Sequence, residues 1–329
     1  MATVRKNEPS AHGLLNLYKP AGITSMDALR RVKRVAGQRK KVGHAGTLDP
    51  LAEGVLPICF GQATRLMEQV VSGRKRYRMA MRLGATSTTY DAEGDITESV
   101  ARVRLNRSEV AAALVNFVGR IEQVPPMYSA IKVDGRRLYE LARAGQEVAR
   151  APRPVQVYEI HIDEIGCSFL RLTVDCGRGT YLRSIAHDLG QALGCGAYVT
   201  ELRRTRCGRF RAEDGVTLEG LEDSAAATDW RVHLQPVDWA LQDCPALRVS
   251  ADQAAAIIQG RAIQADGDTS ASETPETWRA YDPDGVFLAL LEFQAEPGCW
   301  QPRRVFQGSG VSPYAPLPSG APSVRLARW

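Results

Sequence analysis

The chain has 329 residues, of which 44% are hydrophobic and 24% charged, and its formal net charge is +5. Because compact domains usually run to ~100 to 200 residues, we expect one large domain and one smaller domain. No apolar stretch approaches the ~20 residues of a membrane span, and the opening MATVRKNE lacks the apolar core of a signal peptide, which predicts a cytoplasmic protein without a membrane.

Strand-like and helix-like stretches alternate from residue 14 to residue 241 without a long linker. This pattern predicts a mixed α/β (α+β) domain whose sheet is mixed and largely antiparallel. The clearest strand covers residues 76–83, where apolar residues such as Tyr77 and Met79 alternate with mostly basic ones at a period of two. Tyr77 is therefore expected on the inward face. The other predicted elements are strands at 55–60, 155–165, 169–176 and 198–204, and helices at 26–35, from Ser108 as N-cap to Phe117, and at 180–193.

The pattern changes after Pro245. Ser250 is expected to cap a helix that ends before Gly260, and three short strands should follow, two of them joined by a turn at 282–285. A polar, acidic run at 266–277 is predicted to be a loop, and the Gly-, Pro- and Ser-rich tail is predicted to be flexible. The expected parts are an N-terminal extension (1–12), the large domain (13–244), a small β-rich domain (245–307) and the tail (308–329).

Basic residues are concentrated in three blocks, at 30–41, 74–82 and 203–211, whereas acidic residues gather in the last third of the chain. A polyanion would therefore be held mainly by the large domain, and RNA or DNA is the natural candidate.

Cysteine and histidine are scattered. The seven cysteines form no C-x-x-C pair, and the H-x-E and P-C-x-x-C pattern of the zinc nucleobase deaminases is absent. We therefore expect reduced thiols and neither a structural nor a catalytic metal.

The densest motif is GHAGTLDPLAEG at residues 43–54, just before a predicted buried strand. Its three glycines indicate a tightly specified loop in which the backbone can approach a ligand closely. Pro50 holds Asp49 in an extended conformation. An isolated Asp-Pro pair most often starts a turn, but the surrounding glycines favour a functional loop here.

A second motif, GRGTYLRS at residues 177–184, joins an apolar strand to an amphipathic helix. Backbone amides in such a turn suit phosphate, and Arg183 could reach a carboxylate or a phosphate from the first helical turn. By itself this signal is weak, because arginines at helix starts are mostly surface charges. The spacing matches neither the Walker A loop nor the dinucleotide fingerprint, which disfavours an ATP- or nicotinamide-dependent enzyme.

Seven motifs together resemble the bacterial TruB-type tRNA pseudouridine synthases, and they occur in that family's order from about residue 14 to residue 236. They are KPAGITS at 19–25, the loop from Gly43 to Pro57, KRY at 75–77, PPMYSAIK at 125–132, YELARAG at 139–145, GTYLRS at 179–184 and LRR at 202–204. The C-terminal part resembles, more weakly, a small PUA-like RNA-binding domain.

The resemblance implies that Asp49 is the catalytic aspartate, that Arg183 pairs with it, and that Tyr77 stacks on the target base. It further implies that His44, Tyr181 and Leu202 shape the pocket around a flipped nucleotide. The implied substrate is uridine 55 in the TΨC loop of tRNA, bound through the T stem-loop. Tyr18, where the family usually has an aspartate, and Ala45, where Thr or Gly is commoner, are small departures that do not touch the catalytic position.

Pseudouridylation breaks the bond between uracil N1 and the ribose and rejoins the base through C5, so it needs no cofactor. It does need a carboxylate that attacks the sugar, attacks the base, or removes a ribose proton, and these three options stay open. An arginine in contact would favour the charged form of a buried aspartate. The nucleotide must be extruded from its stack, and Tyr77 and Leu202 could then sandwich the uracil.

Other readings remain open. The fold could serve as an RNA-binding or tRNA-folding module without catalysis, or as a synthase acting on another RNA. Without the resemblance, Tyr77 and Leu202 would be read as core residues, and His44 as a loop histidine bonded to backbone. We expect a monomer, because a tRNA arm is a large asymmetric partner.

Overall fold

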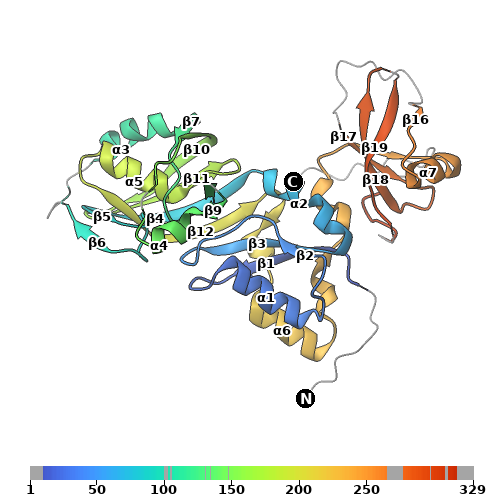
Figure 1. Cartoon of the computed structure of the whole chain (residues 1–329), viewed down its shortest axis with the longest axis horizontal. Helices are drawn as coiled ribbons and strands as arrows, with labels where there is room; N and C mark the ends of the chain where they lie inside the picture. The colour runs from blue at the N-terminus through green and yellow to red at the C-terminus, as the bar shows by residue number, and fades with distance from the viewer. Residues whose placement is uncertain are drawn as a thin grey trace.

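The computed structural model describes residues 10–99, 103, 106–129, 131–133, 135–146, 148–264, 277–296, 298–307 and 310–316 (Figure 1). Within these residues a ten-stranded sheet has the order β14-β1-β3-β12-β4-β11-β10-β7, with β2 beside β3 and β13 beside β12. Most neighbours are antiparallel, and β12 runs parallel to β3. The strands are β1 (Gly13–Lys19), β2 (Val42–His44), β3 (Glu53–Phe60), β4 (Lys75–Leu83), β7 (Gly119–Gln123), β10 (Arg153–Ile165), β11 (Phe169–Cys176), β12 (Ala197–Cys207), β13 (Phe210–Arg211) and β14 (Leu234–Gln235).

Helices cover one face of this sheet. One hydrophobic cluster joins that face to residues of α1 (Ser25–Val35), α3 (Arg107–Leu114), α5 (Leu182–Ala192) and α6 (Leu218–Ala227). The opposite face of β1 and β3 packs in a second cluster with residues of the 3-10 helix η1 (Gly61–Leu66), α2 (Met67–Ser72), the 3-10 helix η5 (Val237–Leu241) and the C-terminal domain. The mixed α/β fold class is thereby confirmed.

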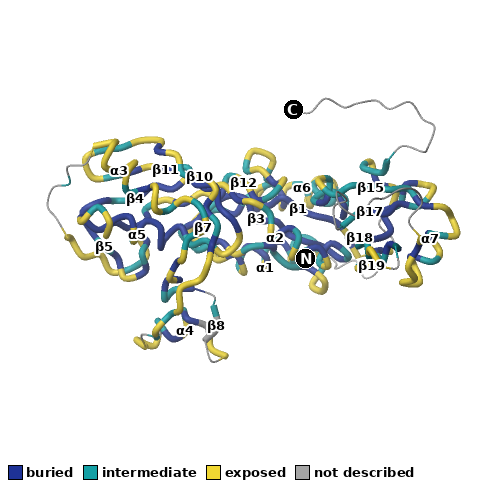
Figure 2. The backbone as a smooth tube through the Cα atoms, turned by 90° about the horizontal axis from the view of Figure 1, so that it is seen from above, coloured by how far each residue is buried: buried dark blue, intermediate teal, exposed yellow. Residues whose placement is uncertain are grey.

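Short elements complete the large domain. They are the hairpins β5 (Ala85–Ser87) with β6 (Ile96–Glu98) and β8 (Lys132–Val133) with β9 (Arg136–Arg137), α4 (Leu138–Arg143), and the 3-10 helices η2 (Val115–Phe117), η3 (Ala212–Asp214) and η4 (Trp230–His233). Figure 2 shows α4 and β8 standing out from the body of the domain.

The small domain is a second sheet, of order β15-β17-β18-β19-β16, packed against one helix. Its elements are β15 (Ala246–Arg248), α7 (Ala251–Ile258), β16 (Ile263–Gln264), β17 (Thr277–Tyr281), β18 (Phe287–Gln294) and β19 (Cys299–Val305). The expected cap is present, since Ser250 and Gln253 form a capping box at the start of α7.

The small domain is docked on the large one through buried polar contacts. The buried carboxylate of Asp238, in η5, accepts hydrogen bonds from the hydroxyls of Tyr281 (2.6 Å) and Ser312 (2.6 Å). Val311 also bridges to Val286. Residues 310–316, assigned above to a flexible tail, therefore pack against the small domain, because Ser312 completes this buried network.

The strands predicted in the large domain are present, with ends that differ by up to three residues, and the last strand of the small domain, predicted to begin at Arg303, begins at Cys299. The predicted cap of α3 was wrong. Asn106, not Ser108, accepts a hydrogen bond from the Glu109 amide, and the Glu109 carboxylate accepts one from the Asn106 amide, which makes a reciprocal capping box. The predicted helix at 180–193 begins later, at Leu182, with Tyr181 as N-cap.

Two predictions fall largely outside the described residues. These are the acidic loop at 266–277, except Thr277 in β17, and most of the N-terminal extension, of which only residues 10–12 are described. In the described part of the chain, no helix combines the length and apolar character needed to cross a membrane.

Candidate active site

Asp49 lies in the loop that joins β2 to β3, and this loop is held at several points. Ser25, in the first turn of α1, accepts a hydrogen bond from the Leu48 amide (2.8 Å) and donates one to the Leu48 carbonyl (2.9 Å). The Gly22 amide donates to the carbonyl of Pro50 (2.8 Å). The residues on either side of Asp49 are thus fixed by the segment around the start of α1.

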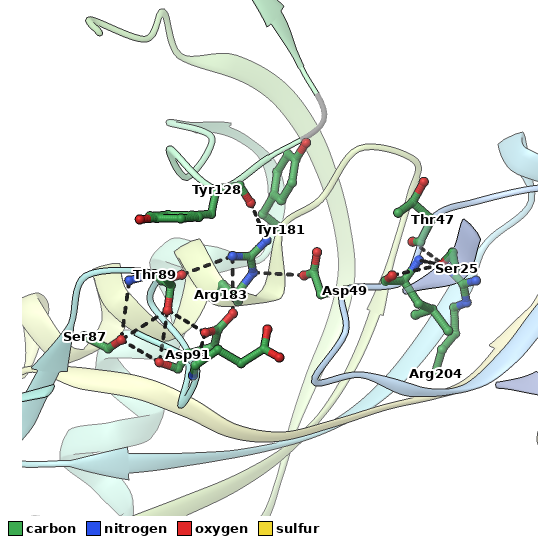
Figure 3. A network of polar contacts seen from close by, with 12 residues as sticks. Ser25, Thr47, Asp49, Ser87, Thr89, Asp91, Tyr128, Tyr181, Arg183 and Arg204 are labelled. Atoms are coloured by element: carbon green, nitrogen blue, oxygen red, sulfur yellow. Dashed lines mark hydrogen bonds and ion pairs between the residues drawn. The ribbon is translucent and has the colours of Figure 1, made fainter. Parts of the chain in front are cut away.

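Arg183, in the first turn of α5, binds Asp49 from the other side of the site (Figure 3). Its Nε lies 2.9 Å from Oδ2 of Asp49. Its two other nitrogens donate to the carbonyls of Thr89 (3.1 Å) and Tyr128 (2.8 Å). The guanidinium is therefore oriented by backbone carbonyls from two separate segments, and its Nε lies next to Asp49.

A second carboxylate shares the same guanidinium. Nη1 of Arg183 lies 3.3 Å from Oδ2 of Asp91, whose side chain is 2% exposed, while that of Asp49 is 32% exposed. The Thr89 hydroxyl donates to Oδ1 of Asp91 (2.5 Å), and the Ser87 hydroxyl donates to its carbonyl (2.5 Å). Of the two carboxylates, only that of Asp49 is open to a substrate.

The turn that carries Asp91 is itself strained and braced. Tyr90 has a φ of 65°, in the left-handed region that non-glycine residues rarely adopt. Its ring stacks on that of His187, from α5, with the ring centroids 3.9 Å apart. Sequence reasoning missed Asp91, because nothing in the local pattern TTYDAEGD shows that this turn meets Arg183.

Burial and neighbouring charges act on Asp49 in opposite directions. Burial raises the pKa of Asp49 above its ordinary value, the charge of Arg183 lowers it, and the charge of Asp91 raises it. The net direction is upward. Arg183 thus favours the anion, as expected, but it does not fully offset burial.

Tyr77 and Leu202 lie on the same face of the sheet as the Asp49 loop. Tyr77 is paired across β4 and β12 with Arg204, and Leu202 is paired with Met79. Arg204 in turn contacts the carbonyls of Gly46 and Thr47 in the loop. Tyr77 and Leu202 are 7% and 6% exposed, so little of either surface is available to a base in this conformation.

Burial raises the pKa of Tyr77 to about 12, which keeps its hydroxyl protonated at neutral pH. A phenol with so high a pKa is poorly suited to giving up its proton.

His44 ends β2, and its Nδ1 is buried without a hydrogen-bond partner among the described residues. Burial lowers the pKa of His44, and the charges of Arg204 and Lys33 lower it further, so the ring is neutral at pH 7. The charge of Arg204 acts on His44, and in the described residues no backbone group bonds to its Nδ1.

Tyr181 stands beside the Asp49–Arg183 pair (Figure 3). Its backbone is fixed by Gln123, which accepts from its amide (2.8 Å) and donates to its carbonyl (3.0 Å). Burial raises the pKa of the Tyr181 phenol, and the charge of Asp49 also raises it.

Lys19 is a further residue of the site that the sequence did not single out chemically. It is fully buried and donates to the carbonyls of Pro20 (2.8 Å), Ile23 (2.7 Å) and Pro50 (3.4 Å). Burial lowers the pKa of Lys19 to about 8. It links the start of α1 to the residue after Asp49.

The other surface of the sheet bears most of two basic blocks. Because successive strand residues point to opposite faces, Arg76 and Arg78 lie opposite Tyr77. With Arg203, Arg206 and Arg211 they line an open groove of about 790 Å³. These arginines point away from Asp49, whereas Lys33, from the first block, acts electrostatically on His44.

Across the described ranges, His, Cys, Asp and Glu side chains form no group of three that could hold a metal ion. The cysteines described in the structure are free thiols, and most of them are buried.

Known proteins resemble this chain in sequence, and a solved structure resembles it in fold. A tRNA pseudouridine synthase B from Ectopseudomonas mendocina (strain ymp) is 42% identical over 310 residues, which are 93% of this chain and 98% of that protein. One from Thiobacillus denitrificans (strain ATCC 25259 / T1) is 44% identical over 295 residues, 89% of this chain and 95% of that protein. The chain belongs to the TruB family of pseudouridylate synthases.

Three sequence models of this family match consecutive parts of the chain. "TruB family pseudouridylate synthase (N terminal domain)" matches residues 33–182, "tRNA pseudouridylate synthase B C-terminal domain" matches 183–242, and "tRNA Pseudouridine synthase II, C terminal" matches 244–307. The predicted resemblance is confirmed over all but the two ends of the chain.

The fold is also that of a solved relative. The crystal structure of a Cbf5-Nop10-Gar1 complex contains a chain that is 26% identical, with a TM-score of 0.68, covering 93% of this chain and 88% of that one. The TruB-family chain is thus an enzyme, a pseudouridine synthase that acts on tRNA.

Proposed function

We propose that this chain converts uridine 55 in the TΨC loop of tRNA to pseudouridine, with Asp49 as the catalytic carboxylate. The observation that supports this most is the Asp49–Arg183 pair, in which one carboxylate is accessible while its partner guanidinium is buried and held by two backbone carbonyls. A preorganised, partly exposed anion is what the isomerisation needs.

The reaction breaks the bond between N1 of uracil and C1′ of the ribose and forms a bond between C5 and C1′. The proton on C5 is lost, and N1 gains one, so no atom is supplied by a cofactor. Asp49 would attack the ribose or the base, or take a ribose proton, and its anionic form serves each route. Arg183 keeps that anion oriented.

The remaining site residues would bind the flipped nucleotide. Tyr77 and Leu202 provide apolar surface for the uracil once the site opens, and base stacking contributes about 1 to 3 kcal/mol. Tyr181 and the neutral His44 would line the pocket beside Asp49. Because Tyr77 and Leu202 are buried in the free chain, binding of the T stem-loop has to be coupled to a local movement.

The alternative of an RNA-binding or tRNA-folding module without catalysis is not favoured by any observation in the site. A module that had lost its chemistry would have no need of an accessible carboxylate on a buried arginine. We place the enzyme in the cytoplasm as a monomer, binding tRNA with both domains and without a metal or cofactor.

The specificity is tested with tRNA transcripts that carry tritium at C5 of every uridine. We expect the enzyme to release one equivalent of tritium from a wild-type transcript and none from a transcript with cytidine at position 55. Equal release from both transcripts would show that the target lies elsewhere, in the tRNA or in another RNA.

A further inference from the structure

Arg204, near the end of β12, is buried to an unusual degree for an arginine. The residue is 1% exposed. Its Nε donates to the carbonyl of Val55 (2.7 Å), and its Nη2 donates to the carbonyl of Gly46 (2.9 Å). Its Nη1 lies 3.4 Å from both the Thr47 carbonyl and the Tyr77 hydroxyl.

A buried cation is ordinarily paired with a carboxylate, since desolvation strongly disfavours an isolated charge. In the described part of the chain, no Asp or Glu forms an ion pair with Arg204, and its side chain bonds instead to the carbonyls of Gly46, Thr47 and Val55 and to the hydroxyl of Tyr77. Three neutral carbonyls and a phenol therefore solvate the guanidinium. Two of these carbonyls, those of Gly46 and Thr47, belong to the loop that bears Asp49.

The contacts of Arg204 connect the Asp49 loop with strands β3 and β4. Gly46 and Thr47 immediately precede the Leu48–Asp49 pair, Val55 lies in β3 at the far end of the same loop, and Tyr77 lies in β4. Arg204 thus spans both ends of the catalytic loop and the aromatic ring opposite it.

The backbone of Arg204 is also held close to the Asp49 loop, through Gly54. Gly54 has a φ of 102°, and a Cβ at this position would lie 2.3 Å from the Arg204 carbonyl. The close parallel approach of β3 to β12 therefore requires glycine here, and it brings the Arg204 side chain beneath the loop. The sequence pattern gives no sign of this, because Arg204 is one of several arginines in a basic stretch.

We propose that Arg204 is a positioning residue for the isomerisation, which sets the Asp49 loop at a fixed distance from Tyr77. The proposal rests on the proposed catalytic role of Asp49. Arg204 does not touch the reacting atoms, but it orients the loop carbonyls on one side while Ser25 fixes Leu48 on the other. Misplacement of a reacting group by about 1 Å can reduce a rate by about 100-fold.

The neighbouring Arg203 provides a matched control. Its side chain is half exposed, lies on the opposite face of β12, and pairs with Glu53 at 3.0 Å and with the Tyr18 hydroxyl at 2.6 Å. Arg203 and Arg204 are thus adjacent in sequence and equal in charge, but Arg204 binds the backbone carbonyls of Gly46 and Thr47 just before Asp49, whereas Arg203 binds two side chains on the opposite face of β12.

The test compares Arg204→Lys and Arg204→Met with Arg203→Lys and Arg203→Met. Three quantities are measured for the full chain: the single-turnover rate at saturating tRNA, the Kd for tRNA, and the thermal unfolding temperature. We expect Arg204→Lys to fold and to react about 10-fold to 100-fold more slowly, with a Kd within about threefold of wild type, because a lysine cannot reach all three carbonyls. Both Arg203 variants should react at the wild-type rate.

Two results would overturn the proposal. One is a folded Arg204→Lys protein with the wild-type single-turnover rate, which would make Arg204 a residue of the fold alone even if Arg204→Met is unstable. The other is a loss of tRNA affinity as large as the loss of rate, which would make it a binding residue. If Asp49→Asn were still active, the proposed role of Asp49 would fail instead, whatever the Arg204 variants do.

Discussion

At the scale of single residues, the site is an arginine shared between two carboxylates of different exposure. Arg183 contacts Asp49 and Asp91, and Asp91 is closed off by Thr89. The resemblance identified Asp49 and Arg183 as a pair, but it did not identify Asp91 or Arg204. Asp91 meets the guanidinium of Arg183, and Arg204 bonds to the backbone carbonyls of Gly46 and Val55. Both contacts join segments that are distant in sequence, and such contacts leave no local periodicity.

The raised pKa of Asp49 predicts a specific pH dependence. If the reaction needs the anion, the single-turnover rate falls as the pH is lowered through a pKa that lies above the ~3.9 of a free aspartate. Asp91→Asn removes a charge that raises this pKa, so we expect the acidic limb of the profile to move to lower pH. The profiles of the two proteins, measured with the same tRNA, check this; a limb that stays in place in Asp91→Asn would contradict the coupling.

At the scale of secondary structure, the period-two pattern of β4 predicted both the strand and the face that Tyr77 occupies. The cap of α3 was mispredicted because Asn106 and Ser108 are both good cap residues, and only the position of Glu109 decides between them. The same alternation shows which arginines face away from the Asp49 side of the sheet. Those of β4 and their neighbours on β12 line the groove on the far side of the sheet.

Two charge reversals test which basic block meets the RNA. Lys33→Glu should weaken tRNA binding, because Lys33 lies near His44. The fall of log K for tRNA association with log salt concentration should become less steep, by about 1 or more in slope. Arg78→Glu should leave the affinity within about twofold, since Arg78 points into the opposite groove. Filter binding over a range of salt concentrations measures both; a larger effect for Arg78→Glu would place RNA on the far face.

At the scale of the whole molecule, the small domain is part of a shared core. Tyr281, Phe287 and Phe306 of that domain belong to the same hydrophobic cluster as Leu14 and Phe210 of the large domain. That a second sheet begins at β15 (Ala246–Arg248) could be expected from the change in pattern at Pro245. The hydrophobic cluster shared by the two domains could not be predicted, because the pattern of each strand indicates only that it belongs to a sheet, and not what packs on that sheet.

The buried contact of Asp238 makes the docking testable. Asp238→Ala leaves the hydroxyls of Tyr281 and Ser312 without their acceptor, so we expect a loss of about 2 to 3 kcal/mol in the free energy of unfolding. Asp243→Ala, which removes an exposed partner of Arg209, should change it by less than about 0.5 kcal/mol. Denaturant titration compares the two variants, and an equal effect of both would mean that the interface contributes little.

The most direct test of the account is a single-turnover measurement with Asp49→Asn. The substitution keeps the shape of the side chain and removes its charge, so tRNA affinity should stay within about threefold of wild type. Tritium release from C5 of the target uridine should fall to the background of a reaction without enzyme. Measurable release by a protein free of wild-type contamination would contradict the role given to Asp49.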